Sequence, residues 1–380
     1  MKKHIQNPFQ FGTIVSGNHF CNREKEISDL TNYIKDGYSV WLYSPRRYGK
    51  SSLIHKAFSE VDSVKTLYFD LYNVKSLDDF SKKYANLIAK NLFSWKQEIK
   101  KLTNRLSHYF INLSPVVSFD HTGSPSFTLN VGEIRQQADV ETILNIPQQI
   151  SIELNQPICI AFDEFQEIDR IEPFLINWMR SAFQQHKNVS YIFLGSEQSL
   201  MEMIFASRKS PFYEFAVKMH IDPIDKEELA QFIDEKFKQQ GLTISHKIID
   251  IILERSEGHP HFTQYFASVV FDMIRGGEDQ YADNFKDRWI EKIIQSQSVM
   301  LQNIYDQLTN KQRAAISAIA LLKENEELFS NDAREKYRLP ASSSLATALD
   351  SLIKKGLIIK DGKRYKMLNP VLRAWLERMG

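Results

Sequence analysis

The segment "VWLYSPRRYGKSSLI", residues 40–54, constrains the fold of this chain more than any other stretch. An apolar run of strand type leads into a polar turn, and the turn leads into a helix-like segment. The turn reads S-P-R-R-Y-G-K-S and departs from the phosphate-loop pattern G-x-x-x-x-G-K-S/T only at its first position, Ser44. A strand before and a helix after are the context that a phosphate loop requires. An ordinary strand–turn–helix is the alternative.

The residue types in this turn suit phosphate chemistry, which needs backbone N–H groups that converge on phosphate oxygens at a helix N-terminus. Gly49 supplies a backbone without a Cβ, Lys50 can reach the β- and γ-phosphates, and Ser51 can offer its hydroxyl to Mg²⁺. Serine at position 44 costs about 1–2 kcal/mol if the turn demands a positive φ there. That strain would weaken binding about tenfold, and the site would remain intact.

A second motif, "PICIAFDEF", reads as a buried strand that ends in two acids. Asp163 would hold Mg²⁺ through water, and Glu164 would polarise the attacking water of an ATPase. Taken alone, two solvated acids at a strand end are the simpler interpretation. Because the pair follows a phosphate loop with β-α alternation between them, the two motifs together favour an ATPase-type site.

Two further motifs are less specific. The strand "YIFLGSE" ends near Ser196, which could sense the γ-phosphate, cap the following helix, or do both. The segment "SEGHPHFTQYF" places Gly258-His259-Pro260 just before a helix. A Gly-x-Pro there could bring an imidazole to a nucleotide, although a plain helix-initiating proline is the simpler interpretation.

Strands that alternate with helices up to about Asp222 predict a mainly parallel sheet covered on both faces. Alternating segments within this region predict an inserted β-hairpin near residues 114–132. Successive helices follow, and the C-terminal region reads as three helices with a hairpin whose turn is Asp361-Gly362, typical of a winged helix-turn-helix. We predict an α/β domain at 1–221, a helical domain at 222–300 and a winged-helix domain at 301–380.

Composition limits the remaining possibilities. The chain has 380 residues and a formal net charge of +1, so a nucleic-acid partner would need a local basic patch. Cys21 and Cys159 are far apart, which argues against a disulfide framework and a zinc site. No secretory signal is readable, and no apolar stretch approaches the roughly 20 residues that span a bilayer. We expect a soluble, cytoplasmic protein without a membrane partner.

Six segments together carry a family resemblance. They are "NPFQFGTIVSGNHFCNREKEI", "SPRRYGKSSL", "IAFDEFQEI", "FLGSEQSLM", "SPFYEFA" and "SEGHPHFTQ". In this order they resemble the prokaryotic STAND-type P-loop ATPases of the AAA+ superfamily, known as the archaeal ATPase family. The resemblance covers nearly the whole chain. It implies an AAA+-like α/β core, a helical lid and a C-terminal winged helix-turn-helix, with ATP or ADP and Mg²⁺ as ligands.

The resemblance also implies roles for individual residues. The family segment F-x-x-R-E-x-E lies by the adenine and matches Phe20, Arg23, Glu24 and Glu26. The family lid element Gly-x-Pro faces the nucleotide and matches His259 and Pro260. The family loop G-P-R-R-x-G-K-S/T-S implies nucleotide contacts along the phosphate loop, from Ser44, Pro45, Arg46, Arg47, Tyr48, Gly49, Lys50, Ser51 and Ser52.

One segment departs from the family pattern. The family commonly has an arginine after P-L-Y-G, a candidate finger that acts on a neighbouring subunit, whereas this chain has Glu214 and Phe215 in "SPFYEFA". This puts finger-driven hydrolysis at that position in doubt. Arg180 and Arg208 are the substitutes, and solvated surface arginines are the simpler interpretation of both.

We predict a slow molecular switch that binds Mg·ATP between the α/β core and the lid and relays its nucleotide state to the winged helix. One alternative is a DNA-binding AAA+ ATPase that resembles replication initiators. Another is a nucleotide-held signalling or defence scaffold with little hydrolysis. A homo-oligomer or an effector protein could be the partner.

The DNA alternative depends on the winged helix. Its wing is surrounded by basic residues: Lys354, Lys355, Lys360, Lys363, Arg364 and Lys366. The predicted recognition helix, "SSSLATALDSLIKKG", offers Ser and Thr side chains, which read bases poorly. Basic wing residues could contact phosphates without reading sequence. The other interpretation is a packing domain that folds back on the nucleotide domain.

Overall fold

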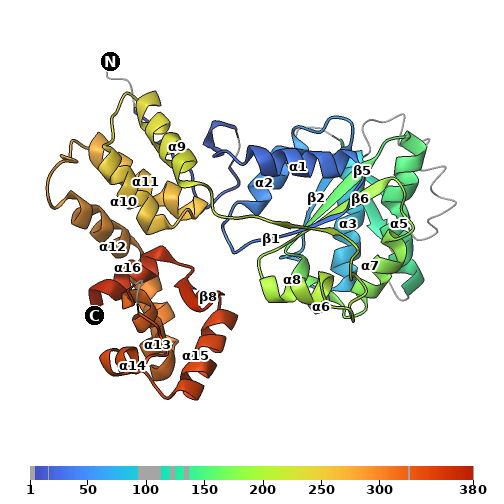
Figure 1. Cartoon of the computed structure of the whole chain (residues 1–380). Coiled ribbons are helices and arrows are strands. Elements are labelled where there is room, and N and C mark those ends of the chain that lie inside the picture. The colour runs from blue at the N-terminus through green and yellow to red at the C-terminus, as the bar shows by residue number, and fades with distance from the viewer. Residues whose placement is uncertain are drawn as a thin grey trace. The chain divides into compact units, whose positions relative to one another are not determined.

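The computed structural model describes residues 5–15, 17–92, 113–119, 125–131, 137–323 and 326–379. The chain divides into two compact units. The first, Asn22–Asp222, is called the sheet unit below, and the second, Met1–Cys21 with Pro223–Gly380, is called the helical unit. The positions of the two units relative to one another are not determined, and each is described by itself (Figure 1).

A parallel sheet forms the centre of the sheet unit. Its strands are β1 (Val40–Tyr43), β2 (Lys65–Asp70), β5 (Ile158–Asp163), β6 (Val189–Gly195) and β7 (Val217–His220). They form a five-stranded sheet in the order β2-β5-β6-β1-β7. Every neighbouring pair is parallel, which confirms the predicted parallel sheet. The carboxyl ends of all these strands therefore lie at one edge, with Tyr43 in register with Gly195 and Asp70 with Asp163.

Sequence patterns missed the edge strand β7. Only Met219 of its four residues is buried, so it lacks the apolar run that marks the other strands. It joins the sheet through backbone pairing with β1, where Val40 is opposite Val217. A strand defined mainly by its partner leaves little trace in the local sequence.

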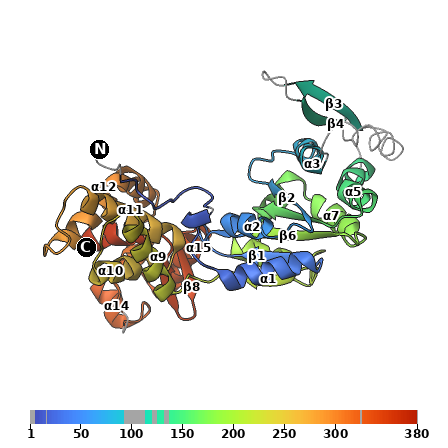
Figure 2. The same ribbon diagram turned by 90° about the horizontal axis from the view of Figure 1, so that it is seen from above.

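Helices cover both faces of the sheet. They are α1 (Glu24–Lys35), α2 (Lys50–Phe58), α3 (Leu77–Leu92), α5 (Gln137–Leu154), α6 (Ile168–Ile171), α7 (Leu175–Phe183) and α8 (Gln198–Phe205). Figure 2 shows α1 on one side of the sheet and α3 with α5 on the other. Strand side chains alternate between the faces, and Trp41, Phe162 and Phe193 belong to a core with α3, α5 and α7. Strands β3 (Leu113–Phe119) and β4 (Pro125–Val131) pair antiparallel.

The helical unit contains a run of α-helices followed by the winged helix. The run comprises α9 (Lys226–Gln239), α10 (His246–Ser256), α11 (Pro260–Arg275) and α12 (Phe285–Asp306). The winged helix comprises α13 (Asn310–Leu321), α14 (Asn331–Lys336), α15 (Ser342–Lys354), β8 (Ile358–Asp361), β9 (Arg364–Met367) and α16 (Pro370–Met379). The predicted hairpin is confirmed, with Asp361 paired to Arg364 and Gly362 at φ +60°.

The prediction of three helices in the C-terminal region was wrong, because the described residues there form four. The extra helix, α14, has only six residues, too few turns for a 3.6-residue periodicity to show. The N-terminal segment also packs within the helical unit, where the ring of Phe9 lies 5.7 Å from that of Phe237 and 6.1 Å from that of Phe271. The domain boundaries at residues 221 and 300 stay a prediction.

None of the helices that the structure describes combines the length and the apolar character that a bilayer-spanning helix needs.

Candidate active site

The phosphate-loop sequence forms the turn between β1 and α2. Gly49 caps α2 with φ +87°, and a Cβ at this position would meet open space. The left-handed backbone at this position favours glycine. Arg47 is also left-handed, at φ +66°. Ser44 is not among the described residues with positive φ, so the strain considered for serine at the first loop position does not arise.

Lys50 is held inside this turn. Its side chain is buried, and its Nζ donates to the carbonyl oxygens of Ser44 at 2.9 Å and Pro45 at 3.2 Å. Burial lowers the pKa of Lys50 to about 8, and the negative charges of Glu164 and Asp163 oppose that shift. A desolvated ammonium with few fixed partners is suited to receive an anion.

The other loop residues differ in exposure. Arg46 and Arg47 are exposed, Pro45 and Tyr48 are half-buried, and Ser52 is buried at the start of α2. The two arginines therefore extend from the outer side of the loop, whereas Lys50 occupies its inside.

Asp163 meets Ser51 at the carboxyl end of β5. The Ser51 hydroxyl donates to Asp163 Oδ2 at 2.8 Å, across 112 residues of sequence. The Tyr68 hydroxyl donates to the same oxygen, and the backbone N–H of Glu164 donates to Oδ1 at 2.9 Å. The carboxylate of Asp163 is therefore fixed at both oxygens.

These oxygen donors fit Mg²⁺, which is usually held by one or two protein oxygens together with phosphate oxygens and water. The Ser51 hydroxyl and the Asp163 carboxylate are the candidates. Among the described residues, no group of three or more His, Cys, Asp or Glu side chains could hold a metal on its own. A bound nucleotide would have to complete the coordination.

Glu164 is held by residues from two strand ends. Its backbone is left-handed, at φ +51°. Ser196 Oγ donates to Glu164 Oε2 at 2.8 Å, and the Gln166 side-chain amide donates to the same oxygen. Gln166 is only 5% exposed. Ser196 does not cap α8, because Glu197 occupies the N-cap position without a side-chain cap bond; of the two roles predicted for Ser196, capping was wrong.

Arg23 lies in the sheet unit and forms hydrogen bonds with backbone carbonyl groups. Its buried guanidinium donates to the carbonyl oxygens of Tyr48 at 3.4 Å and Asp222 at 3.0 Å and pairs with Glu26 at 2.7 Å. The side chain thus ties the phosphate loop to the end of the sheet unit. Phe20 belongs to the helical unit.

His259 and Pro260 also belong to the helical unit. His259 is buried and is the N-cap residue of α11, and Pro260 lies in the first turn of that helix. Pro260 therefore initiates a helix, as its simpler interpretation predicted. Gly258, at φ +71°, approaches the backbone of Ile224 so closely that a Cβ would lie 3.0 Å from its carbonyl oxygen.

The two candidate finger arginines have different surroundings. Arg180 Nε donates to the carbonyl oxygen of Pro211 at 2.9 Å, and its guanidinium lies 4.8 Å from the ring centre of Phe215. Arg180 thus anchors the segment in which the chain departs from the family pattern. Arg208 is exposed.

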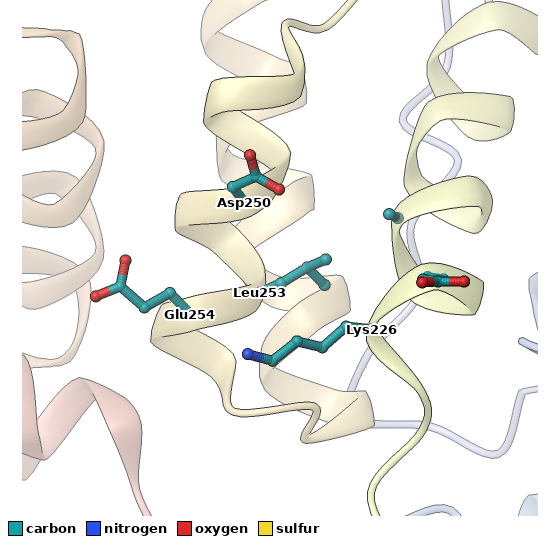
Figure 3. Close-up of a pocket in the computed structure, with 6 residues that line it drawn as sticks. Lys226, Asp250, Leu253 and Glu254 are labelled. Carbon is teal, nitrogen blue, oxygen red and sulfur yellow. The ribbon is translucent and has the colours of Figure 1, made fainter.

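A cleft of about 370 Å³ in the helical unit contains none of the predicted site residues. It lies between α9 and α10 and is lined by Lys226, Glu227, Ala230, Asp250, Leu253 and Glu254. In Figure 3, Lys226 extends from the start of α9 toward α10, which carries the carboxylates of Asp250 and Glu254.

Sequence patterns missed Tyr68 and Gln166. Tyr68 precedes Asp70 by two residues in β2, so strand alternation puts both on one face near the site edge, and this signal could have indicated it. Gln166 lies in a short 3-10 turn, Phe165–Glu167, whose direction no local pattern predicts.

The fold and the site together define a P-loop ATPase with a C-terminal winged helix. The family model described as "ATPase domain predominantly from Archaea" matches residues 20–262, well over half of the chain. The chain therefore belongs to this ATPase family. A second model, "Probable winged helix domain", matches residues 299–378.

Individual proteins show the same likeness. An uncharacterized ATP-binding protein of Methanocaldococcus jannaschii is 25% identical over 263 residues, which cover 65% of this chain and 69% of that protein. The Walker-type ATPase of Pyrococcus abyssi has a similar structure, with TM-score 0.67, 18% identity, and 97% and 99% of the two chains covered. The ORC2 protein of Aeropyrum pernix, in its ADPNP-ADP complexes, gives TM-score 0.56, 13% identity, and 98% and 99% coverage. These structural likenesses show a shared fold.

Proposed function

We propose that this protein is an ATP-driven molecular switch of the STAND type, with Mg·ATP bound at the phosphate loop. The observation that carries the proposal is the contact between Ser51 and Asp163, because it joins the loop to the acidic strand end through two oxygens suited to Mg²⁺. Loop residues 44–52 would cradle the phosphates. Bound Mg²⁺ would neutralise charge on the β- and γ-phosphate oxygens.

In this proposal Lys50 stabilises the phosphoryl group in transfer. Its ammonium would exchange the carbonyl oxygens of Ser44 and Pro45 for phosphate oxygens. The bonds to the two carbonyl groups are already charge-assisted, but a phosphate oxygen also carries negative charge, so the exchange adds the attraction between opposite charges. The exchange therefore favours nucleotide binding.

Glu164 is the proposed residue that orients the attacking water, and Ser196 is the proposed sensor of the γ-phosphate. The two share a hydrogen bond in this structure. If the Ser196 hydroxyl turned to a γ-phosphate oxygen, Glu164 Oε2 would lose one of its two donors. The presence of the γ-phosphate and the orientation of Glu164 would thereby be linked.

Phe20, Arg23, His259 and Pro260 complete the proposed nucleotide contacts. For Arg23 the proposal is indirect: because its guanidinium already binds the carbonyl oxygens of Tyr48 and Asp222, it would act on the nucleotide through the loop. Phe20, His259 and Pro260 would contact the nucleotide from the helical unit.

The proposed relay from lid to winged helix is supported by ion pairs inside the helical unit. Arg373 of α16 pairs with Glu257 at 2.6 Å, and Glu257 immediately precedes Gly258-His259-Pro260. Arg255 of α10 pairs with Glu377 of α16 at 2.5 Å. One hydrophobic core also runs through lid and winged helix. Movement at the Gly258–Pro260 segment would thus be transmitted to α16. We propose the same domain division, at residues 221 and 300.

Nucleotide binding and turnover test the proposal. We expect the wild type to bind a fluorescent ATP analogue with Mg²⁺ and to hydrolyse ATP slowly. Lys50→Ala should abolish binding, and Glu164→Gln should keep binding but lose turnover. Lys56→Ala, on the same helix with a more exposed ammonium, is the matched control. Failure of the wild type to bind nucleotide would refute the proposal. Binding without any turnover would favour the nucleotide-held scaffold instead.

A DNA-binding ATPase is the second candidate, because exposed Lys354, Lys355, Lys360 and Lys363 gather around the wing. Lys366 is less available, since it pairs with Asp361 at 2.7 Å. The exposed face of α15 carries Ser342, Ser343 and Thr347. This arrangement suits phosphate contacts without base readout.

Salt-dependent binding to duplex DNA tests the second candidate. The double variant Lys360→Ala/Lys363→Ala should reduce the salt slope by about 2 if both residues contact phosphates. Lys35→Ala in α1, another exposed lysine, is the control. Stimulation of ATP turnover by duplex DNA would favour this candidate over the switch. Light scattering with ADP and with ATP would test the proposed homo-oligomer.

A further inference from the structure

Tyr68 lies beside the proposed magnesium ligands, Ser51 and Asp163. It comes from β2, the strand next to β5, where it is in register with Ala161. Its hydroxyl donates to Asp163 Oδ2, the oxygen that also accepts the Ser51 hydroxyl. The hydroxyls of two different elements, β2 and α2, therefore converge on one carboxylate oxygen.

The environment of Tyr68 keeps this donor in place. Its ring lies 4.6 Å from the ring of His55 in α2, which restricts the direction of the side chain. The Tyr68 phenol carries a hydroxyl proton to donate, whereas an ionised carboxylate can only accept, so Tyr68 is the donor of this bond.

We propose that Tyr68 is a positioning residue for Mg²⁺ that acts through Asp163. With Tyr68 and Ser51 on Oδ2 and the Glu164 backbone N–H on Oδ1, the Asp163 carboxylate has one orientation before any metal arrives. Hydrogen bonds from such outer partners hold metal ligands in place, and their loss costs about 10–100-fold in metal affinity. This inference rests on the proposed function.

The test is Tyr68→Phe, which removes the hydroxyl and keeps the ring beside His55. Mn²⁺ would replace Mg²⁺ as the probe, and its affinity for the protein–ADP complex would be measured by electron paramagnetic resonance titration. We expect the affinity for Mn²⁺ to fall about tenfold, while the affinity for ADP in EDTA stays unchanged. Tyr72→Phe is the matched control, because Tyr72 is exposed and follows the same strand.

A second variant separates positioning from a general structural effect. In an Asp163→Asn background, adding Tyr68→Phe should cause no further loss of Mn²⁺ affinity, because both changes act through one carboxylate. Unchanged Mn²⁺ affinity in Tyr68→Phe would overturn the inference and leave the proposed function standing. An equal loss of ADP affinity in EDTA would also overturn it, as a merely structural role. A wild type that binds neither ADP nor Mn²⁺ would refute both.

Discussion

Lys50→Met should change the stability of the nucleotide-free protein in a pH-dependent way. Burial lowers the pKa of Lys50 from 10.5 to about 8. Between these values the unfolded chain binds a proton that the folded chain releases, so the free energy of unfolding of the wild type rises with pH in that range. At neutral pH the folded protein carries the whole cost of a buried ammonium, about 3 kcal/mol for this lowering of the pKa.

The variant lacks this cost but leaves two acceptors without a donor. The carbonyl oxygens of Ser44 and Pro45 lose the Lys50 ammonium, at about 1 kcal/mol each or more. The two effects nearly cancel at neutral pH, so the difference in free energy of unfolding between the two proteins at one pH does not test the burial of Lys50. The change of that difference with pH does test it, because the lost hydrogen bonds contribute the same amount at every pH. From about pH 7.5 to about pH 9.5, the wild type should gain about 2 kcal/mol relative to Lys50→Met.

Urea unfolding at a series of pH values, without nucleotide, measures this difference. Subtraction of the two curves cancels the titration of all other groups. Lys56→Met, which removes a more exposed ammonium from the same helix, is the matched control for the loss of a lysine from α2. A flat difference for Lys50→Met would refute the reasoning, because it would mean that the Lys50 ammonium is as well solvated in the fold as in the unfolded chain.

Four other predictions concern single residues. Gly195→Ala should lower the free energy of unfolding in urea by about 1–3 kcal/mol, because the new Cβ would lie 2.4 Å from Met201 Cγ; an unchanged midpoint would contradict this. Ser44→Gly should leave nucleotide affinity nearly unchanged, because Ser44 has no positive φ to relieve, and a tenfold gain by fluorescence titration would show hidden strain. Burial lowers the pKa of His186 from 6.5 to about 4. As pH falls through that range, the unfolded chain binds a proton that the folded chain does not bind, so up to about 3 kcal/mol of the free energy of unfolding should be lost. His186→Gln should therefore flatten the profile of melting temperature against pH. Arg23→Ala should cost about 1–3 kcal/mol in calorimetry without nucleotide, because the guanidinium binds the carbonyl oxygens of Tyr48 and Asp222 and pairs with the partly exposed Glu26; a normal melting temperature would argue that Arg23 acts on the nucleotide directly.

Several site residues could be predicted because their signals are local. The phosphate loop is a strand, a turn and a helix in one continuous segment, and Asp163 ends the apolar strand β5 with Glu164 directly after it. Each motif is defined by neighbours in the chain, so periodicity and turn chemistry reveal it. The parallel sheet and the winged helix could be predicted for the same reason. The assignment of ligand roles to these residues stays a prediction.

Other features depended on which segments meet in space. Arg23 matched a family motif by the adenine, yet its guanidinium binds the carbonyl oxygens of Tyr48 and Asp222. The Gln166 side-chain amide donates to Glu164 because the short turn that carries Gln166 brings this amide close to Glu164 and to Ser196 at the end of β6. Such partners are set by the direction of side chains after packing, and residue spacing does not encode that direction.

The sequence by itself determined the class of this protein, because alternating strands and helices with a phosphate loop after the first strand admit few other folds. Only the tertiary structure decided how the site is held. It showed that left-handed backbone lies at Arg47 and Gly49 instead of Ser44, and that hydroxyls from β2 and α2 meet on Asp163. The physical reason is that strand order brings residues from distant segments to one sheet edge, where burial and hydrogen bonds then select their conformations.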